Sequence, residues 1–323
     1  MPGLGINFFN NNQSTVFLEN PYTSFLNQGN GDIDFSYLSQ FKNKLIILNF
    51  SSEHWNRSEL DVYDQLEKTN INFLMLTYDH TQHQKLPRLV YFPYWYVNCI
   101  DKFENPIEKN KIFDLGVLNG MPSVHRILNH IELVKKSYIE KISIGAFRSP
   151  HDYHAICKRP DDNIQLSTQE RELWNAIPKK GVINYESTFL NLDLPQLNES
   201  YFHLAMETTV LPGVFITEKI WKPIACKVPF LIYGNPATME FLKAQGIDTY
   251  DDVLDHKYYD TESDPRQRLK KLHQVLEDIM LTGTNKIYQR LVPRMTVNQS
   301  KFYNGEFFVD YLQETKKTIT RYS

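Results

Sequence analysis

The feature that most constrains the fold of this chain is a repeated order of short apolar run, polar loop and amphipathic segment. Residues 44–50 and 71–78 are two such runs in the first third, and residues 112–118 begin the same order again in the second half. Short, nearly continuous apolar runs suit strands that are buried on both faces of a parallel sheet. The order therefore predicts an α/β protein with parallel sheets. Further strands are expected at residues 89–93, 141–147, 201–206 and 229–233.

Helix signals fill the intervals between the expected strands of the second half. Apolar side chains keep the spacing of one helix face over residues 124–138. Residues 235–246 and 264–283 each begin with an Asn-Pro or Asp-Pro pair and end at a glycine, which is typical of complete helices. The second half therefore repeats the strand-and-helix order of an α/β domain.

The polar, irregular segment 98–111 separates two stretches of this order. A chain of 323 residues is long enough for two hydrophobic cores. We therefore expect a first domain at residues 1–110 and a second at 111–300, with residues 301–323 forming a C-terminal helix that packs back on the first domain. Two such domains would face each other across a cleft, and ligands of parallel sheets lie at the carboxyl ends of strands.

Charge and cysteine content limit the classes of function. Lysine and arginine number 35 and aspartate and glutamate 38, a net charge of −3, which is a poor basis for holding nucleic acid through phosphate contacts. The three cysteines, Cys99, Cys157 and Cys226, form no paired motif, as is typical of a reducing compartment. No apolar run approaches the length of a membrane span, and the first basic residue is Lys42. We therefore expect a cytoplasmic protein.

Two motifs have the spacing of metal ligands, and both are weak. Asp32 and Asp34 lie in a stretch rich in glycine and asparagine, without a preceding buried strand. His80 and His83 have no third ligand nearby in the sequence. We therefore expect no metal site and no tightly bound cofactor.

The most informative segment runs from Phe202 to Trp221 and contains a helix start. Thr217 is a good N-cap for a helix that begins at Glu218, whereas Lys219 places a cation in the first turn, where the helix dipole disfavours it. A bound phosphate would reverse that effect, because it accepts backbone N–H bonds and pairs with the lysine. The expected helix after Ser123 has Arg126 in the same position, so the two helix starts together suggest a diphosphate site. The alternative is that both cations reach solvent or pair with acids.

Glu53 directly follows an expected buried strand, beside His54 and Trp55. A carboxylate at the carboxyl end of a strand can act as general base on an acceptor hydroxyl. Trp55 can stack on the apolar face of a sugar ring, so His54 and Trp55 are candidate acceptor contacts. The alternative is a surface glutamate that caps the next turn.

With these residues in view, the chain resembles the α1,3-fucosyltransferase family and its bacterial and viral relatives. Residues 202–209 and 216–221 look like the family motifs F-Y-L-A-F-E-N-S and I-T-E-K-L-W. Residues 49–53 are similar to the segment that supplies the family's base, and residues 119–126 to the loop and helix whose arginine holds the diphosphate. Collinear matches cover about residues 45–250. Departures are Thr208, Phe215, Lys222 and Pro223, which surround the donor pocket of the family.

The resemblance implies a GT-B fold with two Rossmann-like domains, an acceptor domain followed by a nucleotide-sugar domain. It also implies inverting transfer without a catalytic metal. By the same resemblance Glu53 is the base, Arg126 and Lys219 hold the diphosphate, Glu218 takes donor hydroxyls, and Glu207 lines the pocket. The expected donor-binding residues are Asn119, Arg126, Glu207, Thr217, Glu218 and Lys219.

These features together predict an inverting, metal-independent glycosyltransferase. It would move fucose or a related sugar from a nucleotide-diphosphate donor, such as GDP-fucose, to a hydroxyl of a surface glycan or glycolipid. One alternative is transfer to a modified base of phage DNA, against which the net charge argues mildly. The other is a glycan-binding or nucleotide-binding protein on the same fold, without catalysis.

Overall fold

The chain consists of two compact units, Met1–Asp101 together with Phe308–Ser323, and Lys102–Phe307. Each unit contains its own four-stranded sheet, and every strand pair in both sheets is parallel. The α/β class with two parallel sheets is therefore confirmed. The computed structural model describes residues 14–18, 35–41, 43–51, 59–79, 86–118, 123–136, 142–144, 164–177, 191–210 and 213–323.

The sheet of the first unit has the strand order β1-β2-β3-β4, which follows the chain. All side chains of β2 and β3 are buried, as their unbroken apolar sequences predict. The elements of this unit are β1 (Thr15–Leu18), a 3-10 helix η2 (Phe35–Phe41), β2 (Leu45–Asn49), α2 (Glu59–Glu67), β3 (Phe73–Thr77), β4 (Leu89–Tyr91), α3 (Tyr94–Lys102) and α13 (Val309–Tyr322).

Helix α13 packs against β3 and β4 of the first unit. The ring of Tyr91 on β4 lies 4.6 Å from that of Tyr311, centroid to centroid, and stacks on Phe308 at 6.2 Å. The sequence places a single helix at residues 301–323, whereas α13 begins at Val309. The residues before it belong to another helix that ends at Tyr303, followed by Gly305 with a φ of 69°, a conformation that favours glycine.

The boundary between the units differs from the sequence-based expectation as well. The units divide at Asp101 and Lys102, where helix α3 ends, rather than at residue 110. The sequence places an irregular segment at 98–111, but its first residues continue α3, whose Tyr96, Val97 and Cys99 are buried. Residues 103–112 have no regular structure.

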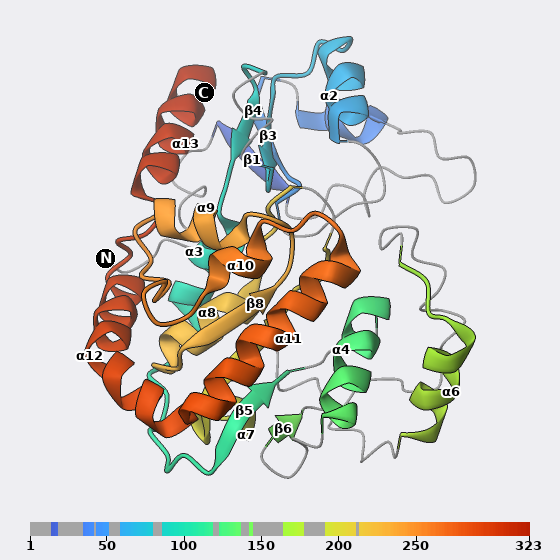
Figure 1. Ribbon diagram of the computed structural model, residues 1–323. Coiled ribbons are helices and arrows are strands. Elements are labelled where there is room, and N and C mark those ends of the chain that lie inside the picture. The colour runs from blue at the N-terminus through green and yellow to red at the C-terminus, as the bar shows by residue number, and fades with distance from the viewer. Residues whose placement is uncertain are drawn as a thin grey trace. The chain divides into compact units, whose positions relative to one another are not determined.

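The second unit contains a sheet of order β6-β5-β7-β8 (Figure 1). Helix α11 crosses in front of β8 in this view and also contacts α4. The elements are β5 (Phe113–Val117), α4 (Val124–Lys135), β6 (Ile142–Ile144), α6 (Thr168–Ala176), α7 (Pro195–Asn198), β7 (Ser200–Met206), α8 (Glu218–Ala225), β8 (Phe230–Tyr233), α9 (Thr238–Ala244), α10 (His256–Asp260), α11 (Pro265–Thr282) and α12 (Thr284–Tyr303).

The order of this sheet reverses between β5 and β7. From β5 the chain moves outward through α4 to β6, and it then returns past β5 to continue through β7 and α8 to β8. Such a reversal leaves a crevice at the carboxyl ends of the two central strands, which is where ligands of open parallel sheets bind. Among the described strands, the first sheet follows the order of the chain and the second sheet contains this reversal.

Close backbone packing fixes one side of this reversal. A Cβ atom added at Gly116 on β5 would lie 1.8 Å from the backbone oxygen of Gln196, so α7 rests directly on the strand. The ring of His203 on β7 contacts the same carbonyl, at 3.2 Å from Nδ1. Only glycine at position 116 allows this approach.

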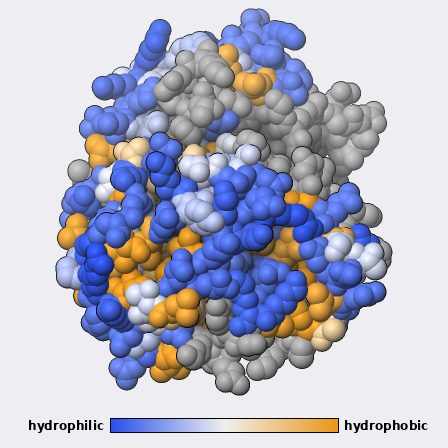
Figure 2. Space-filling model, in the orientation of Figure 1, coloured by the Kyte–Doolittle hydropathy of each residue, from blue (hydrophilic) through white to orange (hydrophobic). Residues whose placement is uncertain are grey.

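The expected strands of both sheets lie where the apolar runs place them, to within a few residues at each end. Helix α11 also matches: Asp264 caps it, Pro265 is its first residue, and Gly283 follows it with a φ of 96°. The outer surface of α11 is mostly hydrophilic (Figure 2), apart from the exposed Leu281 near its end. No helix in the described part of the chain is long and apolar enough to cross a membrane.

Candidate functional site

The reversal between β5 and β7 brings together the residues that the sequence singles out in the second unit. Glu207 and Thr208 follow β7 directly, while α4 begins after β5 and α8 begins after the segment that leaves β7. Two helix N-termini and the carboxyl end of a central strand thus meet within one unit. This is the arrangement that can receive an anionic ligand.

Thr217 and Glu207 form the buried base of this site. Thr217 is the N-cap of α8, and its Oγ1 accepts a hydrogen bond from the backbone N of Lys219 at 3.4 Å. The same hydroxyl donates to Oε2 of Glu207 at 2.6 Å, and the backbone N of Thr217 donates to Oε1 at 3.1 Å. The side chain of Glu207 is completely buried, so the end of β7 and the start of α8 are joined by two hydrogen bonds out of contact with water.

Lys219 projects its ammonium group over this base. Its Nζ donates to Oγ1 of Thr217 at 3.0 Å and of Thr208 at 3.3 Å, and it lies 3.1 Å from Oε1 of Glu218. Oε2 of Glu207 is 3.9 Å away. The side chain of Lys219 is 16% exposed, so it retains some contact with solvent. Lys219 is thus paired with acidic side chains, which is the alternative to a phosphate site that the sequence interpretation left open.

The pKa values of the two glutamates of the site are shifted in opposite directions. Burial raises the pKa of Glu207, and the nearby charge of Lys219 and the hydrogen bonds from Thr217 only partly offset it. Burial acts in the same direction on Glu218, but the charges of Lys219 and Lys222 outweigh it and lower the pKa of Glu218. Glu218 is therefore the more firmly ionised of the two carboxylates.

The first turn of α4 clamps the end of β7. Arg126 is 4% exposed, and its Nη2 donates to the carbonyl oxygens of Met206 at 3.0 Å and Glu207 at 3.1 Å. Nε2 of His125 donates to the same Glu207 carbonyl at 2.9 Å. Ser123 is the N-cap of α4, as the sequence predicts, but its side chain makes no capping hydrogen bond. Arg126 thus lies at the expected helix start, with its guanidinium turned toward the strand.

Sequence reasoning missed several residues that shape this site. His125 carries no motif signal of its own, and its role depends on Glu207, 82 positions away in the chain. Asn235 is the second residue after β8, and its Oδ1 accepts a hydrogen bond from the backbone N of Phe215 at 3.0 Å, which holds the segment before α8. A Cβ atom on Gly234 would lie 3.2 Å from Cβ and Cγ of Glu207. The sequence signal that could have identified Asn235 and Gly234 is a polar residue or a glycine just after a buried strand.

The expected base and acceptor contacts lie outside the described residues. This holds for Glu53, His54 and Trp55, and for the donor residue Asn119. The strand that leads to Glu53 is described: Oδ1 of buried Asn49, the last residue of β2, accepts hydrogen bonds from the backbone N and Oγ of Ser51 at 3.1 and 2.5 Å. The weak metal motifs at Asp32, Asp34, His80 and His83 also lie outside, as does Cys157.

The residues that the structure describes contain no group of three or more histidine, cysteine, aspartate or glutamate side chains placed to hold a metal ion. Within the same residues, Cys99 and Cys226 are buried free thiols.

Comparison with known proteins gives a limited likeness. No protein-family model matches the chain, and no curated protein matches it. A solved structure of the DNA-modifying enzyme β-glucosyltransferase, with and without its substrate uridine diphosphoglucose, is 14% identical over 88% of this chain and 79% of that one, with a TM-score of 0.42. A T4 phage β-glucosyltransferase with its UDP-glucose substrate is 13% identical over 85% and 74%, with a TM-score of 0.39. At these values the likeness assigns no function to this chain.

Proposed function

We propose that this protein is a glycosyltransferase of GT-B type, whose second unit binds the diphosphate of a nucleotide sugar at the reversal between β5 and β7. The motifs at residues 202–209 and 216–221 support the proposal from the sequence. The observation that carries it is the meeting of the starts of α4 and α8 at the carboxyl end of β7, where the side chain of Lys219 is partly exposed.

The charge of the site favours an anion. Arg126, Lys219 and Lys222 contribute three positive charges, and Glu207 and Glu218 contribute at most two negative ones, which leaves a net charge of +1 or more. Because these side chains are largely buried, water screens the excess poorly. A diphosphate at the two helix starts would compensate it and would accept backbone N–H bonds as well.

Each residue then has a defined part in the transfer. Glu53, in the first unit, would remove the proton of the acceptor hydroxyl as that hydroxyl attacks the anomeric carbon from the face opposite the diphosphate. Lys219 would stabilise the negative charge that grows on the departing diphosphate. Glu218, held ionised by Lys219 and Lys222, would accept hydrogen bonds from hydroxyls of the donor sugar.

The first experiment tests the diphosphate site. In Lys219→Met, the affinity for a nucleoside diphosphate should fall by about 1.5–3 kcal/mol, the value of a lost charge-assisted hydrogen bond. Lys286→Met is the matched control. Lys286 is exposed near the start of α12, two residues after Thr284, and Thr284 contacts Asp114 near the amino end of β5. The candidate site lies at the carboxyl ends of the strands instead. Calorimetry on both folded variants measures the affinities. Equal affinity in the two variants would place the diphosphate elsewhere.

The second experiment concerns donor and acceptor. The resemblance favours a fucose donor and a glycan acceptor, whereas the two solved structures named above concern UDP-glucose and, for one of them, DNA modification. A thermal-shift series with GDP-fucose, UDP-glucose and the free nucleotides identifies the donor, because a ligand of the folded state raises its stability. The bound donor is then incubated with oligosaccharides and with DNA that carries hydroxylated bases. Nucleotide binding without transfer from any donor would favour the non-catalytic alternative.

A further inference from the structure

The ammonium group of Lys219, which the proposed function assigns to the diphosphate, has a full set of hydrogen-bond acceptors within the protein. An ammonium group has three N–H bonds. Nζ of Lys219 lies 3.0 Å from Oγ1 of Thr217 and 3.3 Å from Oγ1 of Thr208. Its third acceptor is Oε1 of Glu218, at 3.1 Å. A diphosphate oxygen that accepts a hydrogen bond from Lys219 therefore has to replace one of these three oxygens.

The three acceptors differ in what their displacement involves. The hydroxyl of Thr217 is held in place, because it also donates to Oε2 of Glu207 at 2.6 Å and caps α8. The hydroxyl of Thr208 is neutral, so its displacement changes no charge. Glu218 is the charged member of the three. Its carboxylate opposes a second anion at Lys219, whichever of the three oxygens that anion displaces.

The distances set the size of this opposition. An oxygen that accepts a hydrogen bond from Lys219 lies about 3 Å from Nζ. Oε1 of Glu218 lies 3.1 Å from the same atom, so the two oxygens are within about 6 Å of each other. The side chain of Glu218 is 10% exposed and that of Lys219 16%, so water screens the repulsion poorly. At an effective dielectric constant of about 20–40, one such charge weakens anion binding on the order of tenfold to a hundredfold.

Glu218 also loses a partner when an anion takes its place at Lys219. Although burial raises the pKa of Glu218, the charges of Lys219 and Lys222 lower it, so the carboxylate stays ionised. An ionised carboxylate only accepts hydrogen bonds, and leaving it nearly buried without a donor is costly. The hydroxyls of a sugar are such donors, whereas ionised phosphate oxygens carry no hydrogen to donate. A sugar joined to the diphosphate therefore compensates for the lost contact with Lys219.

We infer that Glu218 makes this site select diphosphates that carry sugar hydroxyls and reject inorganic pyrophosphate. The inference rests on the proposed function, because it takes Lys219 as the diphosphate contact. Glu218 competes with the bound anion for Lys219, and the sugar hydroxyls of a nucleotide sugar relieve that competition. Inorganic pyrophosphate brings the same negative charge without the hydroxyls.

Glu218→Gln tests the inference, because it removes the charge and keeps the size of the side chain. Calorimetry on the folded, full-length protein measures the affinity for inorganic pyrophosphate and for UDP-glucose and GDP-fucose. We expect Glu218→Gln to bind pyrophosphate about tenfold more tightly than the parent protein does. The nucleotide sugar that the parent protein binds should not gain affinity, because a neutral amide oxygen is a weaker acceptor for its hydroxyls than a carboxylate.

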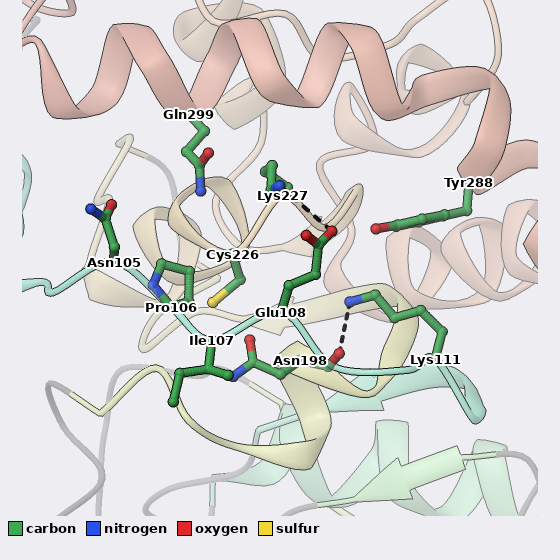
Figure 3. A pocket seen from close by; sticks show the side chains of 10 residues that line it. All are labelled: Asn105, Pro106, Ile107, Glu108, Lys111, Asn198, Cys226, Lys227, Tyr288 and Gln299. Carbon is green, nitrogen blue, oxygen red and sulfur yellow. Dashed lines mark hydrogen bonds and ion pairs between the residues drawn. The ribbon is translucent and has the colours of Figure 1, made fainter.

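Glu108→Gln is the matched control. Glu108 is also paired with a lysine, since its Oε1 lies 3.5 Å from Nζ of Lys227 (Figure 3). The pocket that both residues line also includes Lys111, just before β5, and Asn198, just before β7, so it lies at the amino ends of the strands. The control removes the same charge at the opposite edge of the sheet, and the affinity for pyrophosphate should stay at the value of the parent protein.

Two results would overturn the inference. One is a pyrophosphate affinity in Glu218→Gln that is no higher than in the parent protein. The other is an equal rise for pyrophosphate and nucleotide sugar, because Glu218 would then repel anions without recognising hydroxyls. Failure of the proposed function gives a different result: addition of Lys219→Met to Glu218→Gln would leave the pyrophosphate affinity unchanged, which would place the diphosphate away from Lys219.

Discussion

Removal of the Thr217 hydroxyl should destabilise the candidate site. Thr217→Val keeps the shape of the side chain but deletes the hydroxyl that donates to Glu207 at 2.6 Å and caps α8. The backbone N–H of residue 217 remains bonded to Glu207, so the variant removes one of two links to a buried carboxylate. Thr217→Ser is the matched control, because it keeps the hydroxyl.

The magnitude follows from these two losses. A hydrogen bond to a charged group contributes about 1.5–3 kcal/mol to stability. Loss of an N-cap side chain costs about 1 kcal/mol. Together they predict that the free energy of unfolding falls by about 2.5–4 kcal/mol in Thr217→Val, and by less than about 1 kcal/mol in Thr217→Ser. Because burial raises the pKa of Glu207, the measurement belongs at pH 8, where the carboxylate is ionised more fully.

Urea unfolding followed by far-ultraviolet circular dichroism measures both variants, and a shift of the midpoint at constant slope reports a change in stability. A loss in Thr217→Val that equals the loss in Thr217→Ser would refute the reasoning. It would mean that Glu207 is satisfied without Thr217, and that the start of α8 is not held to the end of β7 by this contact.

Three further predictions concern the core, acid stability and catalysis. Gly116→Ala should lower the free energy of unfolding by more than about 3 kcal/mol, as urea unfolding can measure, because its Cβ would lie 1.8 Å from the Gln196 carbonyl. Gly246 has open space around it and a φ of 83°, so Gly246→Ala should lower the free energy of unfolding by only about 1–2 kcal/mol. Burial lowers the pKa of His273 to about 4, so its stabilising effect is complete above pH 6.5 and is lost as the pH falls to 4. His273→Gln should therefore remove about 3 kcal/mol of the pH dependence in that window, which urea unfolding at several pH values checks. Glu53→Gln should lower turnover by about 10²–10⁴ and leave nucleotide affinity unchanged, as kinetics and calorimetry together can verify.

The strands could be predicted because their signal is local. The five residues of β2 are all buried, and an unbroken apolar run has few alternatives to a strand covered on both faces. Helix α11 was equally visible, since Asp264 and Gly283 mark its two ends in the sequence. These elements are specified by residues within them or directly beside them.

Other elements depend on contacts that no local pattern reveals. Helix α12 contains Pro293 in its interior, a residue that argues against a helix when the sequence is read alone. It forms nonetheless because buried side chains such as Leu291 and Phe302 pack along it. The last five residues of helix α3 lie where the sequence predicts an irregular segment, and its aromatic residues were assigned to no element. Tertiary packing decides both cases.

The candidate site divides in the same way. Thr217, Glu218 and Lys219 are consecutive, so a capping argument finds them together, and Glu207 belongs to the same motif region. The partners of Arg126 could not be predicted, because they are the carbonyl oxygens of a strand about eighty positions later. Their proximity follows from strand order, with β7 placed next to β5, and strand order is not written in any local pattern.

The structure also shows that the two cations at the helix starts, Arg126 and Lys219, have different surroundings. The sequence treats Arg126 and Lys219 as equivalent, each a cation that an anion would stabilise. In the structure Arg126 is buried and donates hydrogen bonds to the carbonyl oxygens at the end of β7. Its positive charge therefore faces the backbone there. Lys219 contacts Glu218 and two hydroxyls, and its side chain is partly exposed. A diphosphate at this site would therefore contact Lys219 directly, and Arg126 would serve it by fixing the position of Glu207 and by adding to the net positive charge.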